Sequence, residues 1–398
     1  MAPPPHVAAL TLGWGAALLV TLGSAGCEDT RPPEGPLATV DAGESDVRVV
    51  RNPRTCEVSR VSAGARHTCA VLVDGRLYCW GANDKAQLGL GDLAPRALPT
   101  FVPTPALVLE PHAAEGSSCA RLADTSVACW GETLGQPVDT PVVATPTRVP
   151  LPGSVANLAL GGAHACAWLS NGTMWCWGEA GLVGDGTALA RPTPVEVAGI
   201  PATTSVLVAT RDHTCTRTPA GEVTCWGRND TGALGVAPGP GVGLIPVRAT
   251  AFTTPVVNLA LAPGLTCTLG TGDLSGAVFC VPPLEGPEQS AWGRDNRVFA
   301  VGPGHACVIR SSGVLACSGK NDAGQLGPDP RLEVPAALPV EALPDALFVS
   351  VGEAHTCALR ADRSLWCWGQ NASGQLGVGT LASTNVPTPV AFPPGCPN

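Results

Sequence analysis

The stretch GEAHTCALRADRSLWCWGQNASGQLG, residues 352–377, decides the fold, because six earlier segments repeat its framework. Each copy places two cysteines about ten positions apart, and the first cysteines of successive copies are 50, 47, 49, 52, 40 and 50 residues apart. A period near 50 indicates one supersecondary unit copied many times. The seven pairs are Cys69 with Cys79, Cys119 with Cys129, Cys166 with Cys176, Cys215 with Cys225, Cys267 with Cys280, Cys307 with Cys317, and Cys357 with Cys367.

The composition between the cysteines favours strands rather than helices. The 398 residues include 48 Gly and 40 Pro, which separate short apolar stretches as turn residues do. About fifty residues accommodate four short strands with their turns. Seven such sheets arranged radially predict an all-β fold, a seven-bladed β-propeller with four-stranded antiparallel blades.

A tight turn is expected midway between the paired cysteines. Asp-Gly, Asn-Gly, Ala-Gly or Ser-Gly stands there in four copies, which fits a three-residue hairpin loop ending in a G1 bulge. Counting outward from Asp74 places Cys69 opposite Cys79 on a non-hydrogen-bonded pair, where two backbones approach closely enough for a disulfide. Thr125 and Arg363 at the glycine position suggest a turn that is not strictly specified.

The cysteine count favours an oxidising compartment. The chain has 17 cysteines, of which fourteen form the pairs. Cys56 and Cys396 bracket the repeats, and a bridge between them is predicted to clasp the ring. Free buried thiols are the alternative, which the regular spacing disfavours. Cys27 then remains for another use.

The N-terminal segment suggests export. Val7 to Leu22 is an apolar stretch too short to span a membrane comfortably, and small residues lead from it to Cys27. This resembles the signal of a bacterial lipoprotein, although Met1–His6 carries no Lys or Arg. We expect a signal peptide over 1–27 with Cys27 acylated, a flexible tether over 28–55 and the propeller over 56–398. A simply cleaved secretory signal is the alternative.

Charge and motifs argue against two classes of function. A net charge of −9 disfavours nucleic-acid binding. The sequence contains no Gly-x-Ser-x-Gly elbow, P-loop or His-Glu-x-x-His motif, so no catalytic residues, enzyme activity or cofactor are expected.

Recurring histidines and tryptophans are interpreted as structural. His-x-Cys occurs five times, but a metal site needs three or four ligands at one point, and equivalent positions fall on different blades. We expect these histidines to hydrogen-bond within their blades, with no metal site, and the Trp of Cys-Trp-Gly to pack between blades. Trp168 and Trp292 do not repeat. Trp292 is therefore a candidate for contact with a partner, whereas Trp168 could equally belong to the core.

The repeats resemble those of the regulator of chromosome condensation family. Gly352 to Leu359 and Trp368 to Gly377 fit the family pattern Gly-x-x-His-x-x-Ala-Leu followed by Trp-Gly-x-Asn-x-x-Gly-Gln-Leu-Gly. The first copy, Gly64 to Gly89, fits as well, and the resemblance extends over about Cys56 to Cys396. It implies a seven-bladed β-propeller, here in a bacterial, disulfide-rich and lipoprotein-like form. The fifth copy departs from it, with Val281-Pro282 in place of Trp-Gly.

The predicted function is a non-enzymatic binding scaffold, a monomer at the outer membrane or cell surface, or alternatively periplasmic or secreted. A lipid anchor would be its sole link to the membrane, and its partner an unidentified protein or surface polymer. Inhibition of a secreted enzyme such as a β-lactamase, and guanine-nucleotide exchange by family analogy, are alternatives. Recognition is expected in the variable inter-copy segments, 90–111, 181–201, 235–255 and 328–344.

Overall fold

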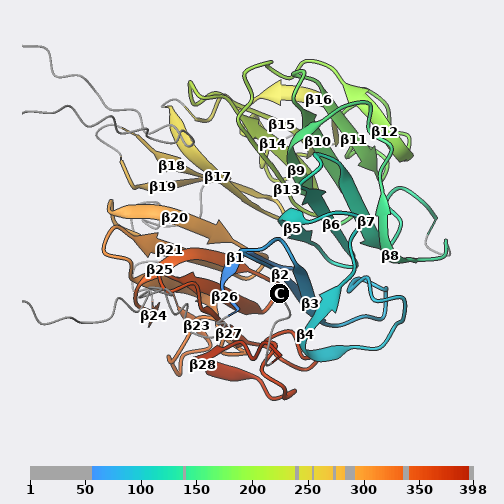
Figure 1. Ribbon diagram of the computed structural model, residues 1–398. Helices are drawn as coiled ribbons and strands as arrows, with labels where there is room; N and C mark the ends of the chain where they lie inside the picture. Colours follow the sequence, from blue (N-terminus) through green and yellow to red (C-terminus); the bar gives the residue numbers. More distant parts are fainter. Residues whose placement is uncertain are drawn as a thin grey trace, which may run out of the picture. The chain divides into compact units, whose positions relative to one another are not determined.

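The computed structural model describes residues 56–137, 140–237, 242–252, 255–271, 275–282, 292–334 and 340–393 (Figure 1). The chain separates into two units, Met1–Arg51 and Asn52–Asn398, and all the described residues belong to the second. The expected signal peptide, Cys27 and the whole tether over 28–55 lie outside them, as does Cys396.

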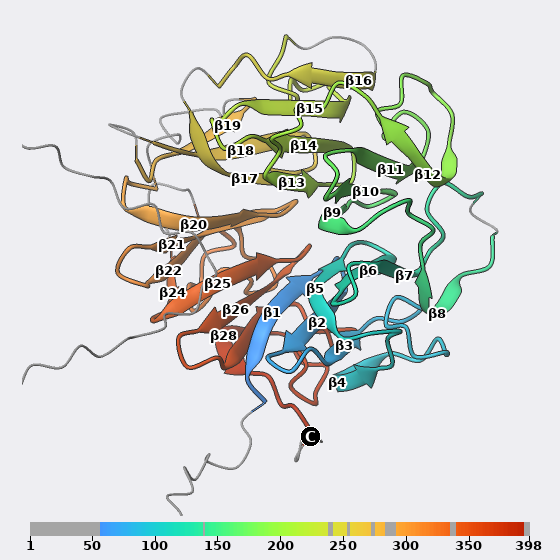
Figure 2. The ribbon, with the colours of Figure 1, turned by 45° about the horizontal axis from the view of Figure 1, so that its top comes forward.

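Seven antiparallel sheets follow one another around an axis, and the predicted all-β seven-bladed propeller is confirmed (Figure 2). We number the blades 1 to 7 in chain order. The innermost strands of neighbouring blades contact one another around the axis. These strands are β1 (Val58–Ala63), β5 (Val108–Ala113), β9 (Val155–Leu160), β13 (Val206–Ala209), β17 (Val256–Ala262), β20 (Asn296–Val301) and β25 (Ala346–Val351).

The second and third strands of each blade form the hairpin that carries its cysteine pair. The second strands are β2 (His67–Leu72), β6 (Ser117–Leu122), β10 (His164–Leu169), β14 (His213–Arg217), β18 (Leu265–Gly270), β21 (His305–Arg310) and β26 (His355–Arg360). The third strands are β3 (Leu77–Gly81), β7 (Val127–Gly131), β11 (Met174–Gly178), β15 (Val223–Arg228), β19 (Val278–Val281), β22 (Leu315–Lys320) and β27 (Leu365–Gly369).

The outermost strands complete the blades at the rim. Among the described residues, blade 5 has three strands and blade 6 has two short outer strands that both pair with β22. The outer strands are β4 (Arg96–Val102), β8 (Val143–Arg148), β12 (Arg191–Val197), β16 (Val242–Arg248), β23 (Glu333–Val334), β24 (Val340–Leu343) and β28 (Thr384–Pro389).

The hairpin turn has the predicted geometry. In blade 1 the amide of Leu72 donates to the carbonyl of Arg76 at 3.0 Å, Gly75 has a φ of 86°, and Cys69 lies opposite Cys79. The same turn occurs with Thr125 (φ 68°) and Arg363 (φ 67°) at the glycine position. The turn type is thus shared, and only the residue that must adopt the left-handed conformation varies.

Seven disulfides join the two central strands of the seven blades. Their Cα atoms are 4.0 to 4.2 Å apart, as expected for non-hydrogen-bonded pairs. On chain-entropy grounds each closed loop of this length contributes about 2–3 kcal/mol. From blade 1 to blade 7 the bridges join Cys69 to Cys79, Cys119 to Cys129, Cys166 to Cys176, Cys215 to Cys225, Cys267 to Cys280, Cys307 to Cys317, and Cys357 to Cys367.

Only one of the two cysteines of the predicted ring-closing disulfide is among the described residues. Cys56 is disulfide-bonded, while its predicted partner Cys396 lies outside the described residues. The bridge between Cys56 and Cys396 therefore stays a prediction.

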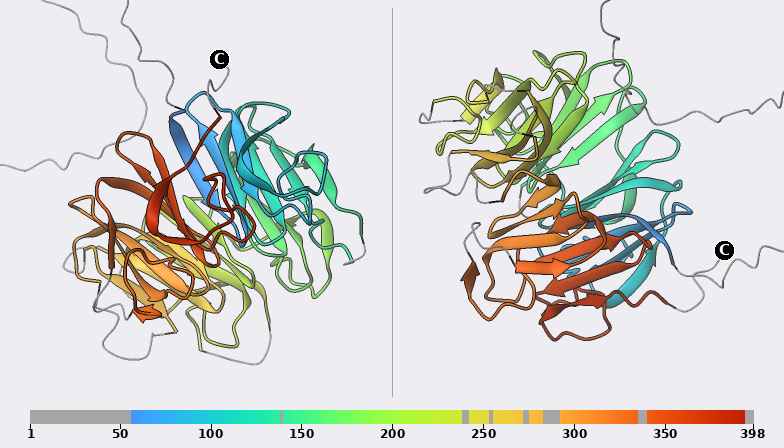
Figure 3. Two further views of the ribbon diagram at one scale, coloured as in Figure 1. Left: turned by 90° about the horizontal axis from the view of Figure 1, so that it is seen from below. Right: turned by 90° about the vertical axis from the view of Figure 1, so that its left-hand side faces the viewer.

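The core lies between blades rather than within any one of them. Figure 3 shows the sheets of the ring from two further directions, with neighbouring blades lying side by side. Cys69 and Leu88 of blade 1, for example, share one buried cluster with Ala120 and Trp130 of blade 2. Each apolar sheet face is therefore covered by the next blade, and the ring must close to cover the first and the last.

The ring closes without exchange of strands, because blade 1 contains β1–β4 and blade 7 contains β25–β28. The amide of Val58 donates to the carbonyl of Arg363 at 3.1 Å across this junction. Beyond β28, the ring of Phe392 packs edge-on against Tyr78 and Trp80 of blade 1, with centroids 5.7 and 6.0 Å apart. The segment after the last strand thus covers the first blade.

The strained turn of blade 2 offers a test of the shared geometry. Replacing Thr125 by Gly should stabilise the protein by about 1 kcal/mol, because a β-branched residue at positive φ costs more than the added freedom of glycine in the unfolded chain. The midpoint of urea unfolding measures this. Ala123→Gly, in the same exposed turn but without positive φ, is the control and should be neutral or destabilising. Equal losses for both variants would contradict the assignment.

Candidate functional site

The recurring histidines cross the junctions between blades. His67 Nε2 lies 2.8 Å from Ser118 Oγ on blade 2, and this hydroxyl donates to the carbonyl of Gln87 on blade 1 at 2.8 Å. A hydroxyl has one hydrogen, so the ring must donate through Nε2–H. The Trp130 indole donates to the same carbonyl at 2.9 Å. The expectation of bonds within each blade is wrong for His67, whose ring points to the neighbouring sheet, and is confirmed in part for His213, whose Nδ1 lies 2.8 Å from Oδ1 of Asp212 in its own blade.

The same contact recurs at four further junctions, and the residue types on its two sides are matched. Blades 2 and 5 have Ser117 and Leu265 at the histidine position, and the blade after each has Ala165 or Ala306 at the hydroxyl position. A hydroxyl residue therefore occurs at this position only where the preceding blade supplies a histidine. The four further contacts are His164–Thr214 (2.6 Å), His213–Thr266 (2.8 Å), His305–Thr356 (2.8 Å) and His355–Thr68 (3.0 Å).

The carbonyl of Gln87 belongs to a loop that is held by hydrogen bonds to its own side chains. We call the segment between the third and the outer strand of a blade its buttress loop. In blade 1, Asn83 Oδ1 accepts from the amide of Leu88 at 3.0 Å, and Gln87 Oε1 accepts from the amide of Lys85 at 2.8 Å. The Asn and Gln of the repeat are thus structural. The loops of blades 4, 6 and 7 are braced in the same way by Asn229, Asn321 and Asn371.

Burial keeps most of these histidines neutral. Desolvation lowers the pKa of His67 and His305 to about 3 and that of His164 and His355 to about 4. A Cβ added at Gly64 would lie 2.7 Å from His67 Cε1, which explains the glycine of Gly-x-x-His. Among the described residues no group of His, Cys, Asp or Glu is arranged to hold a metal ion.

The tryptophans of Cys-Trp-Gly pack between blades as predicted. Trp80 belongs to a buried cluster with residues of blade 7, and Trp226 to one with residues of blade 3. Trp292, the candidate partner contact, is only 6% exposed and packs against the Cys267–Cys280 disulfide and Phe299. Its proposed role is therefore corrected: it fills the core beside blade 5, where the third strand lacks the usual Trp. Trp168 is buried too.

The inter-copy segments reach both ends of their blades. Among the described residues each includes an outer strand, such as β4 within 90–111 or β12 within 181–201. The buttress loop before the strand and the link after it lie at opposite ends of that strand. Recognition by these segments stays a prediction, and each segment offers two separate parts for it.

Four exposed apolar side chains lie near the starts of innermost strands. Six of the seven innermost strands shift register near their start, which inserts an extra residue. Blade 4 pairs without this shift. We call Leu109, Val257, Leu347 and Phe348, which lie at these bulges and are 37 to 48% exposed, the axial residues. The repeat pattern did not reveal them, since a bulge shifts the strand alternation by one.

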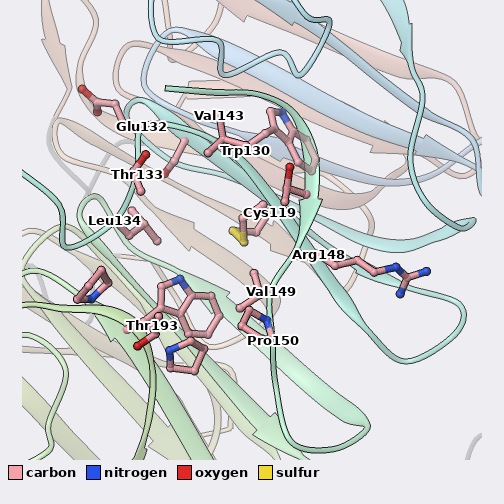
Figure 4. A pocket seen from close by; sticks show the side chains of 16 residues that line it. Cys119, Trp130, Glu132, Thr133, Leu134, Val143, Arg148, Val149, Pro150 and Thr193 are labelled. Carbon is pink, nitrogen blue, oxygen red and sulfur yellow. A yellow bond between two sulfur atoms is a disulfide. The ribbon is translucent and has the colours of Figure 1, made fainter. Parts of the chain in front are cut away.

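A pocket opens at the rim between blades 2 and 3 (Figure 4). It has a volume of about 160 Å³ and lies between the outer strands β8 and β12. Its lining includes Ser117, the Cys119–Cys129 disulfide, Trp130, Trp177 and Leu134, with prolines from both blades. The junction is one of the two without a histidine contact.

Comparison with known proteins agrees with this architecture. The profile described as the regulator of chromosome condensation (RCC1) repeat matches residues 58–87 and 348–375 in one form, and 74–114 and 362–397 in another. The matches thus fall on blades 1 and 7 and on the start of blade 2. The matched ranges include His67, Gln87 and His355, which take part in the interblade contacts described above.

Curated relatives match over short stretches of the chain. An Alsin homolog of Drosophila melanogaster is 39% identical over 62 residues, which is 16% of this chain and 4% of that protein. The ultraviolet-B receptor UVR8 of Arabidopsis thaliana is 49% identical over 45 residues, 11% of this chain and 10% of the receptor. The chain thus spans a small part of these relatives.

Solved structures share this fold over most of the chain. Prp20p of Saccharomyces cerevisiae has a TM-score of 0.50 at 20% identity, covering 84% of this chain and 77% of its own. The ectodomain of the Arabidopsis thaliana receptor kinase ACR4 has a TM-score of 0.53 at 16% identity, covering 82% and 98%. At these identities the likeness shows the fold alone. In the described part of the chain no helix is long and apolar enough to cross a membrane.

The buried neutral histidines predict acid sensitivity. A histidine whose pKa falls from about 6.5 in the unfolded chain to 3 or 4 in the fold binds its proton more readily when unfolded. Stability is therefore complete above about pH 7 and declines toward pH 4, by about 1.4 kcal/mol per pH unit for each such histidine. Urea midpoints measured between pH 8 and 4.5 should fall with decreasing pH.

This window separates histidines from carboxylates, because an unfolded Asp or Glu titrates near pH 4. The double variant His164→Leu with Thr214→Ala copies the residue pair found at the junction of blades 5 and 6, and it should show a shallower decline between pH 7 and 5. A midpoint independent of pH over that range in the natural chain would contradict the burial of neutral imidazoles.

Proposed function

We propose that this protein is an exported, non-enzymatic binding scaffold that recognises a protein or a surface polymer. The observation that carries the proposal is the set of seven disulfides, one in each blade. Disulfides at this density form and persist in an oxidising, extracytoplasmic environment. The lipoprotein form, with acylated Cys27 and a tether to the ring, is the anchoring that best suits the N-terminal sequence.

The chemistry of the repeats supports a binding role. Their cysteines are bridged, and their histidines and buttress-loop amides are engaged in bonds that hold the ring together. Reactive side chains in the repeats are thus used for structure. The exposed apolar axial residues stand on this rigid base, and apolar side chains on a rigid base favour association with a partner.

Two alternatives are weaker. Prp20p is described as binding Gsp1p and histones, and an equivalent role in nucleotide exchange would require a reducing compartment. Inhibition of a secreted enzyme is compatible with export. It would require a convex partner loop to be held by the exposed face, and the single Tyr and six Phe of the chain offer few aromatic anchors.

The proposal predicts that substitution of the axial residues abolishes binding of the partner. The full chain with a C-terminal tag is cross-linked on intact producing cells and purified, and its bound material is identified by mass spectrometry. Leu109→Glu with Val257→Glu should lose the partner. Leu93→Glu with Leu381→Glu, equally exposed but in buttress loops, should retain it.

Recovery of the intact chain in the cytoplasm with reduced cysteines would contradict export. Absence of any cross-linked partner, together with hydrolysis of a polysaccharide or peptide by the purified protein, would contradict the scaffold role. Inhibition of a secreted β-lactamase by the purified chain would replace surface recognition with the inhibitor alternative.

A further inference from the structure

The junction between blades 2 and 3 has lost the groups that fill the other junctions. Trp80 is followed nine positions later by Gly89 in blade 1, whereas Trp130 is followed five positions later by Gly135 in blade 2. Between the third and the outer strand, the buttress loop has fourteen residues in blade 1 (82–95) and eleven in blade 2 (132–142), so it is three residues shorter. At the same junction Ser117 replaces a histidine and Ala165 replaces a hydroxyl residue. This junction therefore lacks the imidazole and the hydroxyl that five other junctions have, and its loop is shorter.

These losses leave a pocket rather than a collapsed contact. The volume of about 160 Å³ is comparable to the roughly 150 Å³ of an engineered cavity that holds one benzene ring. Trp130, Leu134 and Trp177 line it, and Figure 4 shows Trp130 and Leu134 of blade 2 and Thr193 of blade 3 around it. Leu134 is 8% exposed, whereas Leu88, its counterpart in the longer loop of blade 1, is fully buried.

One polar group lies in this pocket without a hydrogen-bond partner. Ser117 is 1% exposed, its Oγ is buried, and it lines the pocket. A buried hydroxyl without a partner is unfavourable by about 1–3 kcal/mol. A ligand that supplied a donor or an acceptor at this point would remove that penalty.

The charges at the rim are already neutralised. Arg148 pairs with Asp124 at 2.6 Å, and Glu132 pairs with Lys85 at 2.8 Å. Arg148 and Glu132 are the two charged residues among those that line the pocket. Because both have partners of opposite charge, the pocket favours a neutral ligand over an ion.

We propose that this pocket binds a neutral phenol ring, either a free phenol or the tyrosine side chain of a partner. The ring lies beside Trp130 and Trp177, where aromatic contacts and burial of apolar area stabilise it. Its hydroxyl hydrogen-bonds to Ser117 Oγ. The site is separate from the axial residues, so it stands or falls independently of the scaffold proposal.

Saturation-transfer NMR with the full chain tests this, using p-cresol and toluene as probes. We expect saturable binding of p-cresol with a Kd on the order of 1 mM, as suits a ligand of this size. Ser117→Ala should reduce the preference for p-cresol over toluene about fivefold, since it removes one hydrogen bond. Ser170→Ala, at an exposed serine of blade 3, is the matched control and should leave the preference unchanged.

A second experiment fills the pocket with a larger side chain. Leu134→Trp should abolish binding of both probes while the thermal midpoint shows a folded ring, and Thr133→Trp at the rim replaces it if that variant does not fold. Binding of p-cresol that persists in a folded, filled variant would overturn the proposal, as would absence of saturable binding to the natural chain or an unchanged preference in Ser117→Ala.

N-acetyltyrosinamide distinguishes the two sources of the ring. If it binds as tightly as p-cresol, the rim admits a peptide backbone, and a tyrosine of a partner is the ligand. If it is excluded while p-cresol binds, the ligand is a free phenol.

Discussion

A hydrogen bond from a histidine ring to the next blade is the polar interaction that recurs between blades, at five of the seven junctions. The seven disulfides lie within blades and join no blade to another. No strand is exchanged between the first and last blades, so their junction uses the contact found elsewhere: His355 to Thr68, whose hydroxyl donates to the carbonyl of Gln375 at 2.9 Å. Disulfides make each sheet rigid, and the interblade contacts make the sheets a ring.

The surfaces available for recognition arise where the repeat departs from its own pattern. Leu109, Val257 and Leu347 are exposed at bulges near the start of their innermost strands. A shortened buttress loop and the loss of a histidine open the pocket between blades 2 and 3. In both cases one copy can change without disturbing the others, because each blade touches only its neighbours.

Local pairing was predictable from sequence, and contacts between copies were not. The period of the cysteines and the turn residues specify the hairpin register, since both partners lie about ten residues apart. Most of the histidine contacts join residues about fifty positions apart. Each single repeat therefore contains only one of the two residues that form a contact. The signal was nevertheless present: Ser117 is matched by Ala165, and Leu265 by Ala306. Trp292 was misassigned because a residue that does not repeat can still fill a core in which a repeating residue has been lost.

A double-mutant cycle on His305 and Thr356 tests the interblade contact most directly. His305→Leu with Thr356→Ala introduces the residue pair that the chain already uses between blades 5 and 6. The free energy of unfolding of the two single variants, the double variant and the natural chain gives the coupling. We predict a coupling of at least about 1 kcal/mol, with the double variant less destabilised than the sum of the single variants. Additivity within about 0.3 kcal/mol would contradict the claim that these contacts hold the ring together.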